Sequence, residues 1–357
     1  MLNFTVGPVM SDPTIIEVAN HSTPYFRTPE FSNLMKENEK LMLSSLSAPK
    51  SSRCVFLTAS GTGAMESVVM NVLNDQDKVL IINGGSFGQR FVDLCRLHKR
   101  TLTEIKLPFG CSLKKEQLML YDNQNYTALL VNMHETSSGV LYNMPMISEF
   151  CKKNNILLII DAISAFLAEN LPMEEWAADV VITGSQKALA VQPGVSVIAL
   201  SEKAICRIEF NKEQCMYLSL KEALNNGVRG QTPFTPAVTT LLQIHQRLID
   251  IEASGGVSQE QKKISDIAQS FRNVIKDLPL EILADCPSNA VTALLAKKSN
   301  AKQIVQILKD NFDIWVCPNG GEWSDKVFRV GHIGYITSED NNKLISALHT
   351  LNKNLLL

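Results

Sequence analysis

The stretch DVVITGSQKALAVQPG, residues 179–194, decides the fold. Residues 180–182 form a short apolar run typical of a buried strand, and residues 183–185 are typical of the turn that ends it. Lys187 follows, just before an apolar run and a Pro-Gly turn. Burial disfavours the charged form of a lysine. A lysine at the edge of the hydrophobic core therefore needs an explanation.

The bulk composition is that of a globular protein with a large interior. The chain has 357 residues, 45% of them hydrophobic, and at this length two domains are the default. A formal net charge of -2 gives no support for nucleic-acid binding. The longest apolar runs, such as ILLII at 156–160, are too short to cross a bilayer. We expect neither nucleic-acid nor membrane partners.

The eight cysteines indicate a reducing compartment. They never form a C-x-x-C pair, and the N-terminal MLNFTVGPVM has no basic region followed by a long apolar core. We therefore expect reduced thiols, a cytoplasmic location and no metal site.

Up to about residue 200, apolar runs alternate with helical patterns. This order predicts an α/β fold with a mostly parallel sheet covered on both faces. Such sheets bind ligands beyond the carboxyl ends of their strands, so polar residues just after each run are the candidates. The predicted strands lie within residues 53–63, 78–84, 126–135, 156–164, 179–185 and 195–201.

The character of the chain changes in its last third. Two long helical patterns, 235–256 and 258–278, are followed by shorter strands mixed with two helices. We predict a large domain over 1–255 and a small α+β domain over 256–357. Residues 1–12 are expected to pack back onto the small domain.

The first strand-end candidate is ASGTGAMES at 59–67. Backbone N–H groups and hydroxyls of Ser60, Gly61, Thr62 and Gly63 could hold a phosphate at a helix N-terminus. A tight turn would use the same residues. The loop matches neither a Walker loop nor a dinucleotide fingerprint, because no G-K-[ST] follows and Glu66 occupies the third glycine position.

Two further candidates end separate strands. Asp161 follows five apolar residues, where a carboxylate is costly unless paired, and it suits a protonated ring nitrogen as well as a helix cap or a loop salt bridge. Lys187, if not merely a surface lysine, can form a Schiff base. A phosphate loop, a carboxylate and a lysine together match the needs of pyridoxal phosphate.

The combined motifs resemble those of class V, fold type I pyridoxal-phosphate aminotransferases. The chain is most similar to the branch that includes serine–pyruvate, alanine–glyoxylate and 2-aminoethylphosphonate–pyruvate aminotransferases. The resemblance runs from Gly7 to the segment at Phe328 and rests on SGTGAME, FGQR, HETSSGVL, DAIS, GSQKAL and RVGHIG in that order. It implies a mostly parallel seven-stranded sheet in the large domain.

The resemblance also implies site roles. Lys187 would bind the cofactor aldehyde and move the substrate proton, and Asp161 would keep the pyridine nitrogen protonated. Thr235 matches a threonine that reaches the phosphate of a neighbouring subunit, which implies a homodimer with shared active sites. The full set of implied cofactor-binding residues is Ser60, Gly61, Thr62, Phe87 (stacked on the ring), Thr136 (near the phenolic oxygen), Asp161, Gln186, Lys187 and Thr235.

Three residues are implied on the substrate side. Arg329 matches the arginine that grips the substrate carboxylate, a task suited to a planar guanidinium. Gly7 lies in the matching substrate-side loop. Arg27, in PYFRTPEF, could bind a second anionic group or serve only in a helix-start salt bridge beside Thr28-Pro29-Glu30.

The expected function is ping-pong transamination. An amino group would pass from alanine, serine or 2-aminoethylphosphonate to a small 2-oxo acid such as pyruvate or glyoxylate. The alternatives are a cysteine desulfurase or other lyase of the same fold and a non-catalytic scaffold that binds pyridoxal phosphate. Desulfurases place histidines where this chain has Gln186 and Phe87, which favours transamination.

Overall fold

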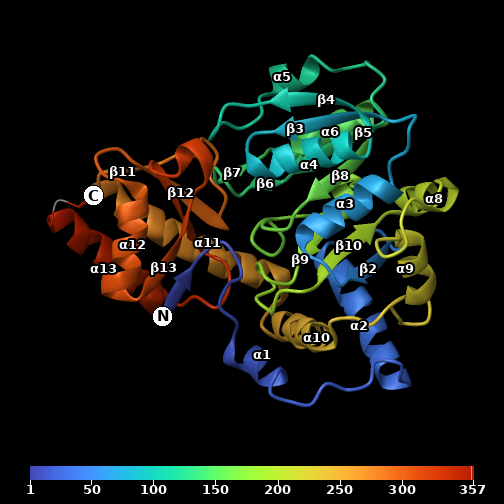
Figure 1. Ribbon diagram of the computed structural model, residues 1–357, viewed down its shortest axis with the longest axis horizontal. Coiled ribbons are helices and arrows are strands. Elements are labelled where there is room, and N and C mark those ends of the chain that lie inside the picture. The colour runs from blue at the N-terminus through green and yellow to red at the C-terminus, as the bar shows by residue number, and fades with distance from the viewer. Residues whose placement is uncertain (355) are drawn as a thin grey trace.

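A seven-stranded sheet forms the core of the larger lobe in the computed structural model, which describes residues 1–354 and 356–357 (Figure 1). β10 alone runs against its neighbours, and the other strands share one direction. The mostly parallel, seven-stranded prediction is confirmed. The spatial order is β2 (Arg53–Leu57), β10 (Ser196–Leu200), β9 (Val180–Gly184), β8 (Leu157–Asp161), β5 (Ala128–Asn132), β3 (Lys78–Asn83) and β4 (Thr101–Lys106).

Helices cover both faces of this sheet because its central strands are apolar on both sides. In β8, Leu157 and Ile159 join one core and Leu158 and Ile160 join the other, as the two-residue period of a strand requires. The first core includes α3 (Gly61–Asn71), α4 (Ser86–Leu97), α8 (Glu202–Phe210) and α9 (Leu220–Gly227), and the second includes α2 (Pro29–Ser45), α6 (Met144–Lys153) and α10 (Val238–Ala253).

The helix that follows the PYFRTPEF stretch begins where the sequence signals it. Pro29 occupies the first turn of α2, where its missing N–H costs nothing. The Thr28 hydroxyl accepts a hydrogen bond from the Phe31 N–H at 3.2 Å. This cap fixes the direction in which the preceding chain, including Arg27, enters the larger lobe.

The smaller lobe is built on a second sheet, which the N-terminal strand joins. β1 (Leu2–Phe4) pairs in parallel with β13 (Ile314–Pro318), and Figure 1 shows the two side by side. The sheet continues through β14 (Val327–Gly331), β12 (Val291–Ala296) and β11 (Leu280–Ile282). Its apolar face packs with α11 (Gly256–Val274), α12 (Ala301–Phe312) and α13 (Ser338–Lys353).

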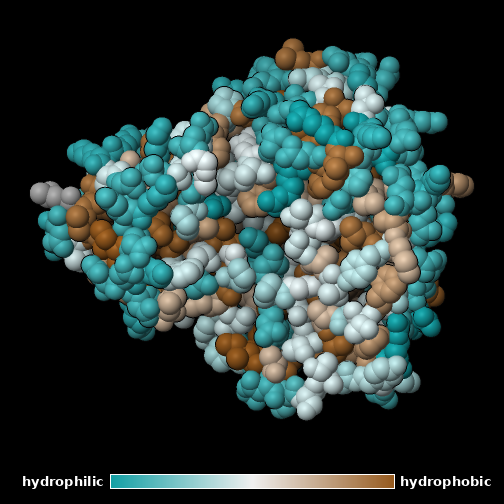
Figure 2. All heavy atoms as spheres, in the orientation of Figure 1, coloured by the Kyte–Doolittle hydropathy of each residue, from teal (hydrophilic) through white to brown (hydrophobic). Residues whose placement is uncertain are grey.

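Short elements complete the chain. They are α1 (Pro13–Val18), α5 (Lys115–Met119), α7 (Met173–Trp176), the hairpin of β6 (His134–Glu135) and β7 (Val140–Leu141), and the 3-10 turns η1 (Ile275–Asp277) and η2 (Gly321–Trp323). Within the described ranges, every helix is too short or too polar to cross a membrane. Figure 2 shows hydrophobic residues scattered among hydrophilic ones on the visible face.

The sheet topology brings several strand ends to one edge. The parallel strands β2, β5, β8 and β9 end there. Asn132 and Asp161 are the last residues of β5 and β8, and the Ser60 loop and Lys187 come shortly after β2 and β9. Residues far apart in the sequence can therefore form one site at this edge, facing the smaller lobe.

Candidate active site

Lys187 lies in the turn after β9, and its amine is held by the N-terminal segment. Its Nζ donates a hydrogen bond to the Val6 carbonyl oxygen at 2.5 Å. Burial, followed by the nearby charge of Arg329, lowers the pKa of Lys187 from 10.5 to about 8. A large fraction of the amine is therefore neutral near pH 8, and a neutral amine can act as a nucleophile or accept a proton.

Gly7 permits this close approach of the N-terminal segment. Its backbone has a φ of +123°, and a Cβ there would lie 2.7 Å from Lys187 Cδ and 2.9 Å from Lys187 Nζ. The Val9 N–H also donates to the carbonyl oxygen of Gln186 at 3.3 Å. Residues 6–9 thus cover the lysine, and Gly7 and Gln186 lie beside it.

Asp161 is buried at the end of β8 and accepts two hydrogen bonds. Asn132, its register partner at the end of β5, donates from Nδ2 at 2.5 Å, and the Ile163 N–H donates at 2.8 Å. Burial is the main reason why the pKa of Asp161 is raised to about 6. A carboxylate so desolvated is well suited to a cationic partner such as a protonated ring nitrogen. The sequence reasoning missed Asn132.

The Ser60 loop leaves a helix N-terminus open for an anion. Ser60 is the exposed N-cap of α3, and its side chain makes no capping bond within the described chain. Gly61 and Thr62 begin the helix, so their N–H groups lie at the positive end of its dipole. Arg90 donates to Thr62 Oγ1 at 3.0 Å and adds a positive charge that the sequence reasoning did not identify.

Phe87 lies in the first turn of α4, half-buried beside this loop. The Arg90 guanidinium carbon is 4.8 Å from the centre of its ring. Glu135, buried in β6, accepts a hydrogen bond from the Gly88 N–H at 2.9 Å. It also accepts one from the Ser137 hydroxyl. Glu135, another residue missed from the sequence, occupies the α4 N-terminus and so fixes the position of Phe87.

Thr136 belongs to a buried hydrogen-bond chain. Its Oγ1 lies 2.6 Å from Ser164 Oγ, which lies 2.9 Å from His134 Nδ1. Burial first, then the charge of Lys187, lowers the pKa of His134 to about 3, so this ring is neutral at neutral pH. Among the described residues its Nε2 is buried without a partner. Thr136 is therefore rigidly placed, with His134 behind it.

Arg329, on β14, joins the two lobes at the site. Its guanidinium donates to the carbonyl oxygens of Thr136 at 3.2 Å and Pro318 at 2.8 Å, and to Cys317 Sγ at 3.1 Å. Its Nε is buried and has no partner in the described part of the chain. A half-buried cation with a buried, unused donor favours an anionic ligand.

A cleft of 710 Å³ opens between the lobes beside these residues. Phe87 and Arg329 both line it. The ring expected to stack on the cofactor and the arginine expected to bind the substrate carboxylate therefore border the same cleft. Its volume lies within the range of about 300–1,000 Å³ typical of ligand sites. Of the implied site residues, only Phe87 and Arg329 line this cleft. The carboxylate of Asp161, the amine of Lys187 and the open N-terminus of α3 lie at or just after strand ends along one edge of the sheet, and together with the ring of Phe87 they fit pyridoxal phosphate.

Arg27 and Thr235 do not line this cleft. Arg27 donates to Gln231 Oε1 and to the Thr232 carbonyl oxygen, both at 2.9 Å, and to the Pro233 carbonyl oxygen at 3.3 Å. Arg27 thereby holds the segment that leads into Thr235, which is exposed just before α10.

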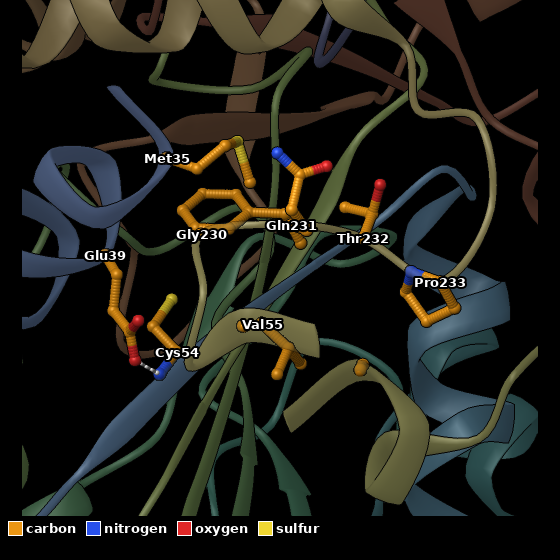
Figure 3. Close-up of a pocket in the computed structure, with 11 residues that line it drawn as sticks. Met35, Glu39, Cys54, Val55, Gly230, Gln231, Thr232 and Pro233 are labelled. Carbon is orange, nitrogen blue, oxygen red and sulfur yellow. Dashed lines mark hydrogen bonds between the residues drawn. The ribbon is translucent and has the colours of Figure 1, made fainter. Parts of the chain in front are cut away.

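The pocket in Figure 3 belongs to this neighbourhood and not to the cleft. It is lined by Gln231, Thr232 and Pro233 together with the middle of β2, where the Cys54 N–H donates to Glu39 at 2.9 Å. Its volume of 20 Å³ admits about one water molecule. It is too small for a substrate.

The fold and the site define a transaminase of the pyridoxal-phosphate type. The family model of aminotransferase class-V matches residues 16–330, and the chain belongs to that family. The expected family, cofactor and enzyme class are therefore confirmed.

Individual proteins are similar over most of their length. The soluble hydrogenase 42 kDa subunit of Anabaena cylindrica is 30% identical, with 97% of this chain and 91% of that protein covered. A serine–glyoxylate aminotransferase of Hyphomicrobium methylovorum is 28% identical, with 88% of this chain and 78% of that protein covered. The crystal structure of an alanine–glyoxylate aminotransferase from Nostoc sp. matches with a TM-score of 0.92 at 22% identity, covering 98% and 95% of the two chains, and supports the fold.

Proposed function

We propose that this enzyme transfers an amino group from a small amino acid, of the alanine or serine type, to glyoxylate or pyruvate. The observation that carries the proposal is the grouping of Lys187, with its lowered pKa, near Asp161 and Arg329, whose charges both act on it. The relative named a serine–glyoxylate aminotransferase supports this donor and acceptor pair.

Each group would have a separate task. Pyridoxal phosphate, when bound, supplies an aldehyde carbon that carries the amino group and a ring that withdraws electrons from the substrate Cα. Asp161 would hold a proton on the ring nitrogen. The N-terminus of α3, with Ser60, Gly61 and Thr62, would bind the phosphate, and Phe87, Thr136 and Gln186 would position the ring.

Arg329 and Lys187 would act on the substrate. Arg329 would fix its α-carboxylate through the unused Nε–H together with a terminal N–H released from Cys317 or Pro318. The neutral amine of Lys187 would accept the Cα proton at Nζ and deliver it to the former aldehyde carbon of the cofactor. Gly7 would keep the covering loop close to this amine. The segment of residues 6–9, which is hydrogen-bonded to Lys187 and Gln186, would limit the access of water to the amine.

Thr235 supports a homodimer with shared sites. It is exposed and adjoins a segment held by Arg27, so its hydroxyl is free to meet another subunit's phosphate. Arg27 would have to exchange three hydrogen bonds to contact a second anion such as an aminophosphonate. If Arg27→Ala leaves turnover of every donor unchanged, that role is lost.

All eight cysteines are free among the described residues, which supports a cytoplasmic protein.

The test is a panel of amino donors added to the pyridoxal-phosphate form, followed by the cofactor's absorbance and by the 2-oxo product. We expect alanine or serine to convert the cofactor to its amino form and glyoxylate or pyruvate to restore it. A panel in which no donor does so refutes the proposal. Sulfide release from cysteine would instead identify a desulfurase. The thiol nearest to the site, Cys317, lies within β13 and accepts a hydrogen bond from Arg329, which gives it little freedom to move.

A further inference from the structure

Two aromatic rings, one from each lobe, line the 710 Å³ cleft side by side. Phe109 follows β4 in the larger lobe, and Trp323 lies in η2 of the smaller lobe. Their ring centres are 4.7 Å apart and their planes differ by 20°. This is the offset-stacked geometry that aromatic pairs favour. One wall of the cleft, formed by Phe109 and Trp323, is therefore made of both lobes.

The Phe109 side of this wall is tied to the smaller lobe. The Asp285 N–H donates to the Gly110 carbonyl oxygen at 3.0 Å, and the Ser112 N–H donates to the Asp285 carboxylate at 2.8 Å. These bonds flank Phe109 on its C-terminal side. The backbone next to Phe109 cannot move away from the smaller lobe without breaking them.

The loop that carries Trp323 belongs to the smaller lobe and is hydrogen-bonded to the larger lobe. Asn319 donates from Nδ2 to the Ser137 carbonyl oxygen at 2.9 Å, and Ser137 directly follows the Thr136 that Arg329 contacts. Arg329 also binds the carbonyl oxygen of Pro318, in the same loop as Trp323. The distance between the Arg329 guanidinium and the aromatic wall is therefore set by short, hydrogen-bonded segments.

We propose that the Phe109–Trp323 stack is the size filter for the amino donor, limiting how long a side chain the cleft accepts. This inference rests on the proposed function for the role of Arg329 in anchoring the α-carboxylate. With the carboxylate held by Arg329, a side chain that extends along the cleft meets the two rings, and a longer side chain has to displace or separate them. The substrate class is thus amino acids with short side chains.

Two measurements on the holoenzyme test the filter. The first is the dissociation constant, by calorimetry, of straight-chain carboxylates of increasing length from propionate to hexanoate. The second is kcat/KM for the matching donors, from alanine to norleucine, with glyoxylate as acceptor. Trp323→Ala and Phe109→Ala remove the two halves of the wall. Trp315→Ala is the matched control, because Trp315 is also partly exposed, at 40%, but lies on β13 against Lys309.

In the wild type we expect long donors and carboxylates to be disfavoured. Trp323→Ala and Phe109→Ala should each raise the hexanoate-to-propionate affinity ratio and the norleucine-to-alanine kcat/KM ratio by about tenfold or more. Trp315→Ala should change neither ratio. Unchanged ratios in both wall variants, or an equal loss for all chain lengths, would overturn the filter. Absence of transfer from every donor, with the carboxylate ratios still shifting, would overturn the proposed function and leave the filter standing.

Discussion

Replacement of Gly7 by alanine tests whether the N-terminal loop sets the position of Lys187. A side chain at a φ of +123° costs about 1–3 kcal/mol of stability. The new methyl carbon would also lie 2.7 Å from Lys187 Cδ, whereas carbon atoms in contact sit about 3.5–4.0 Å apart. Lys187 must then move by about 1 Å, and displacements of that size cost on the order of 100-fold in rate.

Gly256→Ala is the control that separates these two effects. Gly256 also has a positive φ, +78°, but a Cβ there has no heavy atom within 4 Å among the described residues. We expect both variants to lose stability in thermal unfolding. Only Gly7→Ala should lower kcat, measured with the best donor of the panel and normalised to bound cofactor. If Gly7→Ala keeps the wild-type kcat, the loop does not position the lysine and the argument fails.

Three further predictions concern the charged groups. Asp161→Asn should lower kcat by about 100-fold, because the ring nitrogen loses its anionic partner, and an unaltered kcat would contradict this. Arg329→Lys keeps the charge but not the paired geometry, so the donor KM should rise by about tenfold, and an unchanged KM argues against carboxylate binding. The pKa of Lys187 is lowered to about 8, so the neutral amine accumulates as pH rises and saturates above that value. Uptake of pyridoxal phosphate by the cofactor-free protein should therefore accelerate about tenfold per unit below pH 8 and level off above it, whereas acceleration up to pH 10 would refute the shift.

The sequence revealed the central strands because they are buried on both faces. β8, with Leu157, Leu158, Ile159 and Ile160, is a short continuous apolar run, which is typical of a parallel strand buried on both faces. β4 was not predicted, because it is an edge strand in which only Ile105 is buried. Thr101 and Lys106 are exposed and residues 102–104 are only half-buried, so the strand has little apolar pattern to detect.

The candidate site divides in the same way. Asp161 is recognisable because it directly follows an apolar run, where burial of a charge is costly, and Lys187 because it lies just after the turn that ends such a run. Asn132 directly follows another apolar run, and Glu135 lies three residues further on. Their importance lies in their partners, Asp161 and the N-terminus of α4, which are distant in sequence. The sequence shows that a polar residue lies at a strand end, but it does not show which group that residue binds.

The sequence by itself determined the class of fold, the cofactor and the two central catalytic candidates, since each rests on local patterns of burial and charge. Only the tertiary structure decided what surrounds them. It brought Val6 and Gly7 over Lys187, tied Arg27 to residues 231–233, and stacked Phe109 on Trp323 across the cleft. These contacts join segments with no shared periodicity, and they exist only because the lobes pack against each other and the strand ends share one edge.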